Sequence, residues 1–201
     1  MEWAGIISAL GTIILGFFQY NQYTKNKRTD YKLEKWKEED RLLNEQRSEN
    51  SMLVYGELWD LLYKLDADRV YIVQPHPLGN EEMFTIYFEV KRSWAVQMKP
   101  HIQQMKISEV AKFAADLAKN IYMYITDIDT QIKDRYVQSI FASCGTNNVI
   151  IKKLSNRKYG YIGSIFCEFS DNIKISDAEA RDILHKSATN IQYILPEIRE
   201  L

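Results

Sequence analysis

The sequence predicts an α+β protein, with an antiparallel sheet flanked by helices and a long N-terminal transmembrane and stalk helix before it. Three observations predict this fold class. Strand-like runs lie near one another with turn residues between them, as in antiparallel hairpins. Runs with helical spacing come before and after these strands. Between Gly16 and Gly56 there is neither glycine nor proline, so one helix can run through this stretch without a break.

Residues 1–24 are predicted to be a transmembrane helix. No charged residue occurs from Trp3 to Thr24, and a helix of about 22 residues rises about 33 Å, enough for the hydrocarbon layer of a bilayer. Lys25 and Arg28 follow, which by the positive-inside rule places the C-terminal side in the cytoplasm. The side chains expected in the membrane are Trp3, Ile6, Ile7, Leu10, Ile13, Ile14, Leu15, Phe17 and Phe18.

The same segment carries Ser8, Thr12 and Gly16 at intervals of four residues, a spacing that lets two membrane helices approach closely. It predicts a homo-oligomer through this helix. A buried core helix is the alternative interpretation of the segment. Residues 25–50 are strong helix formers of mixed charge and predict a helical stalk, either a plain spacer or one whose first basic residues contact anionic lipids.

Residues 51–201 are expected to form the α+β domain. Ser51 is a plausible cap for a first helix over 51–66, whose apolar stripe is Leu53, Leu58, Leu61, Leu62 and Leu65. Two antiparallel strands follow, Arg69–Val73 before Pro75, and Met83–Val90. In the second strand Phe84, Ile86, Phe88 and Val90 are expected on one face.

A second helix is expected to begin at Ser108, with Val110, Phe113, Ala114, Leu117, Ile121 and Ile125 facing inward. Strand-like runs follow at residues 137–143 and 159–169, with residues 149–154 as a further strand or a short helix. The last helix is capped by Ser176–Asp177 and runs to Pro196. Because the strands cluster, we expect the terminal helices to cover one face of the sheet.

Composition and motifs exclude several classes of function. The 26 basic and 27 acidic residues nearly cancel, which gives no reason to expect a nucleic-acid partner. Cys144 and Cys167 make no disulfide framework, and with three histidines they show no metal-ligand spacing, so no metal and no cofactor are predicted. No phosphate-loop, dinucleotide, esterase or zinc-protease motif occurs. Ser143–Cys144 has no histidine or carboxylate at motif spacing, and we expect no enzyme activity.

Two segments resemble strands of GAF-type domains. The run from Asp68 to Ile72 is similar to the first strand, and the run from Tyr161 to Phe169 to the penultimate one. The likeness extends to small phage-encoded, membrane-anchored GAF-like proteins whose first strand reads D-R-V-x-I-Y-x-F-H-N-G. Matching positions are Asp68, Arg69, Val70, Ile72 and His76, while Pro75, Pro77, Leu78 and Gly79 depart from the pattern. The resemblance implies a pocket for a small molecule, such as a nucleotide or tetrapyrrole, or a dimerising regulatory module.

Polar residues on the two first strands are the candidate ligand-binding set. They are Arg69, Tyr71, His76, Tyr87, Glu89 and Arg92. Alternation on an exposed sheet face would produce the same pattern. The sequence therefore predicts a single-pass, membrane-anchored, non-catalytic GAF-like module that binds a small molecule or a protein at the cytoplasmic face. The alternative is a phage-encoded holin-like membrane protein whose other domain regulates its assembly.

Overall fold

The structure is a computed structural model that describes residues 3–78 and 82–195. Within the first helix it leaves out the side chains of residues 3–21, 23, 24, 26 and 28–30. The chain divides into two compact units, residues 1–48 and residues 49–201.

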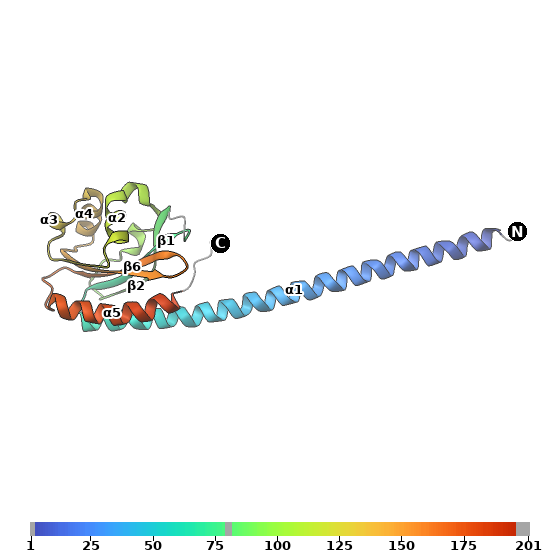
Figure 1. The fold of residues 1–201 in the computed structure, drawn as a ribbon, viewed down its shortest axis with the longest axis horizontal. Helices are drawn as coiled ribbons and strands as arrows, with labels where there is room; N and C mark the ends of the chain where they lie inside the picture. The colour runs from blue at the N-terminus through green and yellow to red at the C-terminus, as the bar shows by residue number, and fades with distance from the viewer. Residues whose placement is uncertain (1–2, 79–81, 196–201) are drawn as a thin grey trace. The chain divides into compact units, whose positions relative to one another are not determined.

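Helix α1 runs from Trp3 to Lys64 and supplies the whole of the described first unit (Figure 1). Ion pairs between successive turns follow its charged part, such as that of Arg41 with Glu45. Over the part of the chain whose side chains are described, no helix is long and apolar enough to cross a bilayer. The predicted membrane side chains, from Trp3 to Phe18, lie outside that part.

The second unit contains one antiparallel sheet of six strands in the order β3-β2-β1-β6-β5-β4. The strands are β1 (Arg69–His76), β2 (Met83–Lys91), β3 (Met105–Lys106), β4 (Tyr122–Ile125), β5 (Asn148–Asn156) and β6 (Gly160–Phe169). The helices are η1 (Lys99–His101), η2 (Ile107–Val110), α2 (Ala111–Lys119), α3 (Ile128–Gln131), α4 (Arg135–Ser143) and α5 (Asp177–Ile194). This confirms the predicted antiparallel sheet flanked by helices.

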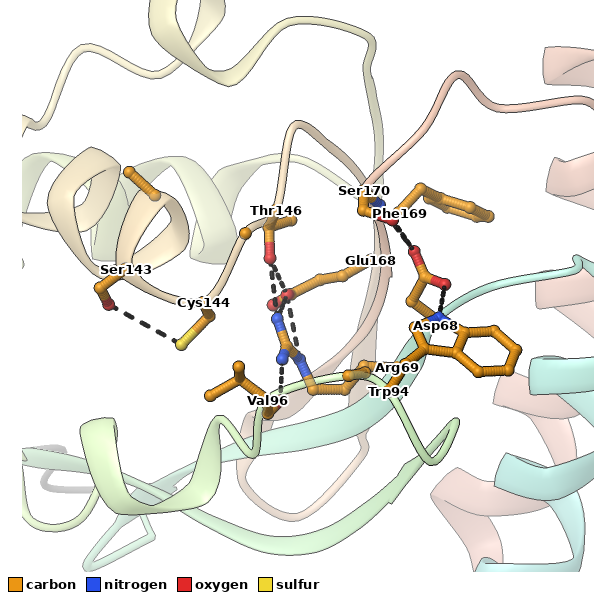
Figure 2. Close-up of a pocket in the computed structure, with 13 residues that line it drawn as sticks. Asp68, Arg69, Trp94, Val96, Ser143, Cys144, Thr146, Glu168, Phe169 and Ser170 are labelled. Atoms are coloured by element: carbon orange, nitrogen blue, oxygen red, sulfur yellow. Dashed lines mark hydrogen bonds and ion pairs between the residues drawn. The ribbon is translucent and has the colours of Figure 1, made fainter.

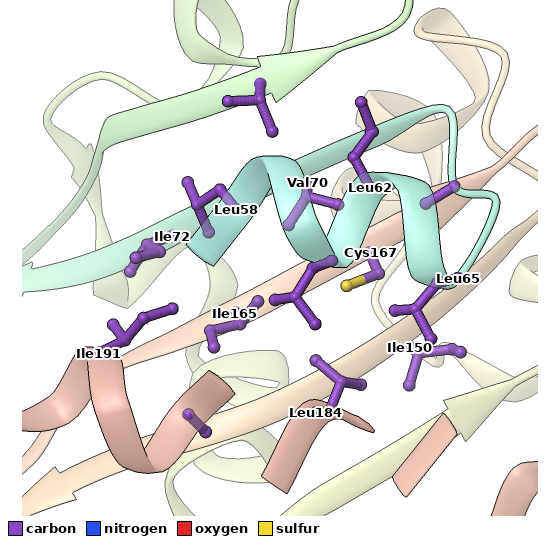
Figure 3. Packing of buried hydrophobic residues seen from close by; sticks show 14 of the residues in the cluster. Leu58, Leu62, Leu65, Val70, Ile72, Ile150, Ile165, Cys167, Leu184 and Ile191 are labelled. Carbon is purple, nitrogen blue, oxygen red and sulfur yellow. The ribbon is translucent and has the colours of Figure 1, made fainter. Parts of the chain in front are cut away.

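The two faces of the sheet carry separate apolar cores. The end of α1 and α5 cover one face, as predicted, with Leu58 and Leu184 packed against strand residues such as Ile165 (Figure 3). Helices α2, α3 and α4 cover the other, where Phe113 and Phe166 are buried (Figure 1). Every strand in the middle of the sheet is therefore shielded from water on both sides.

A β-bulge at Tyr87 divides β2. The pairing with β1 passes from Ile72↔Phe88 to Val73↔Ile86, so Tyr87 is an extra residue on β2. A bulge reverses the alternation of a strand. The expectation that Phe84, Ile86, Phe88 and Val90 share a face is therefore wrong, since the first two lie in one core and the last two in the other.

The predicted strand at residues 137–143 is also wrong, because this segment is helix α4. Its buried residues, Val137, Ile140 and Phe141, recur at three and four positions, which is helical spacing. Asp134 caps the helix by accepting hydrogen bonds from the N–H groups of Tyr136 and Val137. The short strand β4 had not been expected.

Several element ends differ from the expectation. Ser51 lies inside α1 and is not a cap, and Leu53 is 56% exposed while Val54 is buried in its place. Ser108 caps neither η2 nor α2, which begin after Lys106 and Val110. Ile121 is 68% exposed because α2 has already ended.

Strand β1 continues through Pro75 to His76 instead of ending at Val73. Strand β6 pairs with β1 only as far as Val73, so the proline lies where β1 has a single neighbour. A strand proline, which lacks an N–H group, is tolerated at such a position. Ser176 does cap α5, accepting a hydrogen bond from Glu179 N–H.

Candidate functional site

The candidate site is a cleft of about 410 Å³ at the end of the sheet where β1 begins and β6 ends (Figure 2). We call it the cleft. The loop after β2 and the turn after α4 complete it. It is lined by Asp68, Arg69, Trp94, Ala95, Val96, Ala142, Ser143, Cys144, Gly145, Thr146, Glu168, Phe169 and Ser170.

The floor of the cleft is a buried ion pair. Arg69 and Glu168 lie directly opposite each other in the β1–β6 pairing, and their exposed fractions are 2% and 1%. Tyr71, two residues along β1 on the same face, is completely buried beside them. The antiparallel register thus brings together groups that are 99 residues apart in the chain.

Hydrogen bonds saturate this floor (Figure 2). Arg69 Nε donates to Glu168 Oε2 at 3.1 Å, and Nη2 donates to the same oxygen and to Thr146 Oγ1, the latter at 2.8 Å. Arg69 Nη1 donates to the Val96 carbonyl, which ties the loop after β2 to the floor. Glu168 also accepts from the Tyr71 hydroxyl and from Thr146. Buried charges need such complete pairing, because each unpaired group costs free energy.

The pKa values of Arg69 and Tyr71 in the floor of the cleft are both raised. Burial raises the pKa of Tyr71 well above its ordinary value, and the neighbouring Glu168 carboxylate adds to the shift. For Arg69, burial lowers the pKa but the charge and hydrogen bonds of Glu168 outweigh it, so the net shift is upward. At neutral pH the Arg69 guanidinium is therefore charged and the Tyr71 phenol neutral.

One rim of the cleft is built on Asp68. Its Oδ2 accepts from both the N–H and the hydroxyl of Ser170, each at 2.7 Å, and its Oδ1 accepts from Trp94 Nε1 at 2.9 Å. Burial raises the pKa of Asp68, but these hydrogen bonds outweigh it, so the pKa lies below its usual value. The ring of Trp94 is 69% exposed although its position is held. It offers an aromatic surface to a ligand.

Cys144 contributes a thiol to the opposite wall. Burial raises its pKa, so it stays protonated at neutral pH. Its Sγ lies 3.8 Å from Ser143 Oγ, and no histidine lines the cleft. Both cysteines are free. The chemistry available here is stacking and hydrogen bonding.

The structure brings some of the six predicted ligand-binding residues together and separates others. Arg69 and Tyr71 form the floor of the cleft. Glu89 lies on the same face, but its carboxylate accepts from the N–H groups of Met98 and Lys99 at 2.6 and 2.9 Å. It therefore holds the loop after β2.

The other three lie elsewhere. Arg92 bonds to Asp66 and the Ala67 carbonyl and lies over the rings of Tyr63 and Trp94. His76 is at the far end of β1, about 23 Å from Arg69 at the usual rise of a strand, and its Nε2 lies 2.8 Å from Thr85 Oγ1. Tyr87 packs against the core under α1 and α5.

Sequence reasoning missed Glu168, Thr146, Trp94 and Asp68 as site residues. A signal for Glu168 was present, because it is the single charged residue in the apolar run Tyr161–Phe169. A charge inside a buried strand requires a buried partner. Thr146 and Trp94 lie in loops and had no such signal.

A second, apolar cavity lies between the sheet and helices α2 and α4. Phe84, Phe113, Phe141 and Phe166 are among the side chains that fill this region. The free space is about 20 Å³. That is room for about one water molecule, so this region is core.

The sequence matches no protein-family model and no curated protein. Similar solved structures include GAF3 from Slr1393 of Synechocystis sp. PCC6803 in its photoproduct state, at 10% identity and a TM-score of 0.58, covering 71% of this chain and 90% of that one. The phycoerythrobilin-bound GAF domain of a cyanobacterial phytochrome matches at 13% identity and 0.57, covering 78% and 92%. The blue-light absorbing form of the Thermosynechococcus elongatus PixJ GAF domain matches at 9% identity and 0.58, covering 74% and 88%. These likenesses confirm a GAF-like fold.

Proposed function

We propose that this protein is a non-catalytic, membrane-anchored GAF-like module of the cytoplasmic face, which takes a small-molecule ligand in the cleft. The observation that carries the proposal is the floor of the cleft. There a buried and fully hydrogen-bonded ion pair, Arg69–Glu168, lies beneath an opening of about 410 Å³. Ligand sites in proteins have this range of volume, with a few fixed polar groups among apolar walls.

The arrangement of the walls favours binding. The exposed ring of Trp94 can stack on a ligand, while Val96, Cys144 and Phe169 provide apolar contact. Thr146 and Ser170 contribute hydroxyl groups that are held in place by Glu168 and Asp68. A site whose groups are fixed before the ligand arrives loses little entropy on binding.

The same groups argue against catalysis. A nucleophilic cysteine needs a lowered pKa and a neighbouring base, whereas burial raises the pKa of Cys144. Arg69 and Glu168 neutralise each other, so neither is available for proton transfer. We therefore propose a sensory or regulatory role in which ligand occupancy is the signal.

The solved neighbours support a ligand role by analogy, since one of them is a phycoerythrobilin-bound GAF domain. Because the two sequences are only 13% identical, this analogy rests on the similar fold alone. A tetrapyrrole is not the ligand that we propose here. The apolar cavity between the sheet and α2 and α4 holds about 20 Å³, and the cleft suits a smaller molecule.

Membrane anchoring rests on the composition of Trp3–Thr24 and on the basic residues after it. A phage origin and self-association through this helix rest on sequence alone.

Membrane anchoring is tested by fractionation of cells that express the full chain or a chain starting at Lys25. We expect the first in the membrane fraction and the second outside it. Recovery of both chains in the same fraction would contradict the anchor, and lysis on expression would favour the holin-like alternative.

Ligand binding is tested on the full chain in lipid nanodiscs by a thermal-shift screen of small metabolites. A ligand of the native state raises the melting temperature by mass action. We expect Trp94→Ala to weaken binding of a hit at least tenfold, because it removes the stacking surface. The control is Trp59→Ala, an exposed tryptophan on α1 outside the cleft. Equal binding by both variants would remove the cleft as the site.

A further inference from the structure

Arg69, the basic residue that lines the cleft, has little free hydrogen-bonding capacity. It uses four of its five N–H donors inside the chain, on Glu168, Thr146 and the Val96 carbonyl. Its charge is matched by Glu168, with which it forms an ion pair. The Thr146 hydroxyl also donates to Glu168. The floor of the cleft therefore offers little to a phosphate or a carboxylate, which binds through several charge-assisted hydrogen bonds.

The turn after α4 does not supply an anion site either. The backbone N–H groups of Cys144, Gly145 and Thr146 all donate to carbonyl groups of α4. The Ser143 hydroxyl donates to the Ile140 carbonyl at 2.7 Å. Anion sites in loops are built from free backbone N–H groups, and here these groups are engaged. Nucleotide phosphates therefore do not suit the cleft.

Asp68 gives the cleft a negative charge. Burial raises its pKa, but hydrogen bonds from Ser170 and Trp94 bring the pKa below its usual value, so the carboxylate is ionised at neutral pH. Among the described residues, no lysine, arginine or histidine forms an ion pair with Asp68. Arg69 and Lys174 act on it at longer range, but each is bonded to another carboxylate. The charge of Asp68 is thus available to a ligand cation.

The ring of Trp94 lies beside this carboxylate (Figure 2). Its Nε1 donates to Asp68 Oδ1 at 2.9 Å, and the ring is 69% exposed. A hydrogen bond to a carboxylate polarises the indole and makes its face more attractive to cations. The Arg92 guanidinium already lies over this ring, 5.8 Å from its centre, and pairs with Asp66 at 3.2 Å. A second cation that stacks on the exposed part of the ring would lie near Asp68.

We propose that the ligand of the cleft is a planar aromatic cation, such as an N-alkylated nitrogen heterocycle, which stacks on Trp94 beside Asp68. This inference rests on the proposed function of the cleft and adds the chemistry of the ligand. The side chains of Val96 and Phe169 provide apolar contact for the flat hydrocarbon part. Tryptophan is the aromatic side chain that attracts cations best, and the carboxylate adds Coulomb attraction.

The test uses three probes that have two fused rings and differ in charge. They are 1-methylquinolinium, a cation; quinoline, which is uncharged at neutral pH; and 2-naphthoate, an anion. Isothermal titration of the full chain in nanodiscs of uncharged lipid measures their binding, with empty nanodiscs as the blank. We expect 1-methylquinolinium to bind about tenfold more tightly than quinoline, and 2-naphthoate to bind most weakly. This order on the unmodified chain tests the role of charge independently of any variant.

Two variants assign the binding to the cleft. Trp94→Ala should weaken binding of 1-methylquinolinium about tenfold, because the stacking surface is lost. Asp68→Asn keeps an oxygen that can accept from Trp94 but removes the charge, so 1-methylquinolinium should bind it no more tightly than quinoline does. Its affinity for quinoline should be unchanged, which shows that the cleft is intact. The matched control is Asp182→Asn, an exposed carboxylate on α5 outside the cleft, which should bind all three probes normally.

The outcomes separate this inference from the proposed function. Tighter binding of quinoline or 2-naphthoate than of the cation, lost in Trp94→Ala, would overturn the cationic class and keep the cleft as the site. Failure of 1-methylquinolinium to bind would also overturn the class, while the screen of metabolites still tests the cleft. Equal affinity of every probe for the unmodified chain and for Trp94→Ala would count against the cleft itself.

Discussion

Arg69 and Glu168 illustrate how a single buried charge constrains its surroundings. Both are almost completely buried. Arg69 donates to Glu168, Thr146 and the Val96 carbonyl, and Glu168 also accepts from Tyr71 and Thr146. The pair holds β1, β6 and two loops in one arrangement. The pair matters for stability because removal of one partner leaves the other charge unpaired in the interior, which is strongly destabilising.

Replacement of Glu168 by alanine should therefore lower the free energy of unfolding by about 3–5 kcal/mol, because Arg69 loses its buried counter-charge. Urea denaturation followed by circular dichroism measures this. The control is Asp60→Ala, which breaks the exposed Asp60–Lys64 pair and should have little effect. A double replacement, Arg69→Met with Glu168→Leu, should recover much of the loss. Similar midpoints for Glu168→Ala and Asp60→Ala would contradict the role of the pair.

Gly163 is required by its backbone. Its φ angle is +148°, and a Cβ atom there would lie 2.7 Å from the Val73 carbonyl oxygen. Gly163→Ala should lower the free energy of unfolding by about 1–3 kcal/mol. Gly56→Ala is the matched control, because the glycine lies inside α1 with nothing within 4 Å, and alanine should stabilise by about 0.5–1 kcal/mol. Shifts of the same sign in thermal unfolding would refute this reasoning.

The lowered pKa of Asp68 predicts that the stability of the folded chain falls in acid. Its pKa is lowered in the folded chain, so its contribution to stability is present above the unfolded pKa of about 3.9 and is lost as pH falls through the folded value. Asp68→Asn should be less stable than the unmodified chain at pH 7. The difference between the two melting temperatures should close in acid below about pH 4. A constant difference from pH 7 to pH 3 would show that Asp68 does not titrate with folding.

At the scale of elements, the bulge in β2 and the last turn of α4 decide where several residues of the cleft lie. The bulge at Tyr87 lets β2 serve both cores, with Phe84 on one side and Phe88 on the other. The bulge also leaves Glu89 on the same face of the sheet as Tyr71. There the Glu89 carboxylate accepts a hydrogen bond from Met98 N–H and so holds the loop after β2, which completes the cleft. Helix α4 places Cys144 and Thr146 at the opposite wall, immediately after its last turn.

The start of α4 depends on Asp134, whose Oδ1 accepts from the N–H groups of Tyr136 and Val137 at 3.1 and 3.3 Å. Asp134→Ala should lower the free energy of unfolding by about 1 kcal/mol, as loss of an N-cap does. The neighbouring exposed residue provides the control, Lys133→Ala, which should change little. Chemical denaturation of both variants is the measurement, and equal effects would show that the cap is unimportant.

At the scale of the whole molecule, both apolar cores are made by residues from Val54 onward. The first unit, residues 1–48, supplies none of their side chains in the part described. The end of α1, in contrast, contributes to the core, because Val54, Leu58 and Leu61 are completely buried against the sheet.

A chain that begins at Glu49 should consequently unfold cooperatively, at a melting temperature within a few degrees of the full chain. A chain that begins at Asp66 lacks five buried side chains, the four of α1 (Val54, Leu58, Leu61 and Leu62) and Leu65 directly after it. Removal of a single buried leucine costs about 2–5 kcal/mol, so this chain should not fold. Scanning calorimetry distinguishes the two, and cooperative unfolding of the shorter chain would show that the core needs no part of α1.

The fold class could be predicted from the sequence because helices and hairpins depend on residues close together in the chain. The stripe from Leu58 to Leu65, the cap at Ser176 and the pairing of the first two strands are all local patterns. Arg69 and Tyr71 were proposed as site residues from the same kind of pattern, on a strand that proved to lie at the centre of the sheet.

Only the tertiary structure decided the site. Glu168 faces Arg69 because the register of β6 against β1 places them opposite each other, and that register depends on both cores at once. Trp94 and Thr146 reach the cleft from loops, and loop residues follow no periodic pattern from which their positions could be predicted. His76 and Arg92 were predicted as site residues from their residue types, but the length of β1 places His76 far from the cleft, and local hydrogen bonds hold Arg92 against Asp66. Local sequence thus determined which elements form, and long-range packing determined which side chains meet.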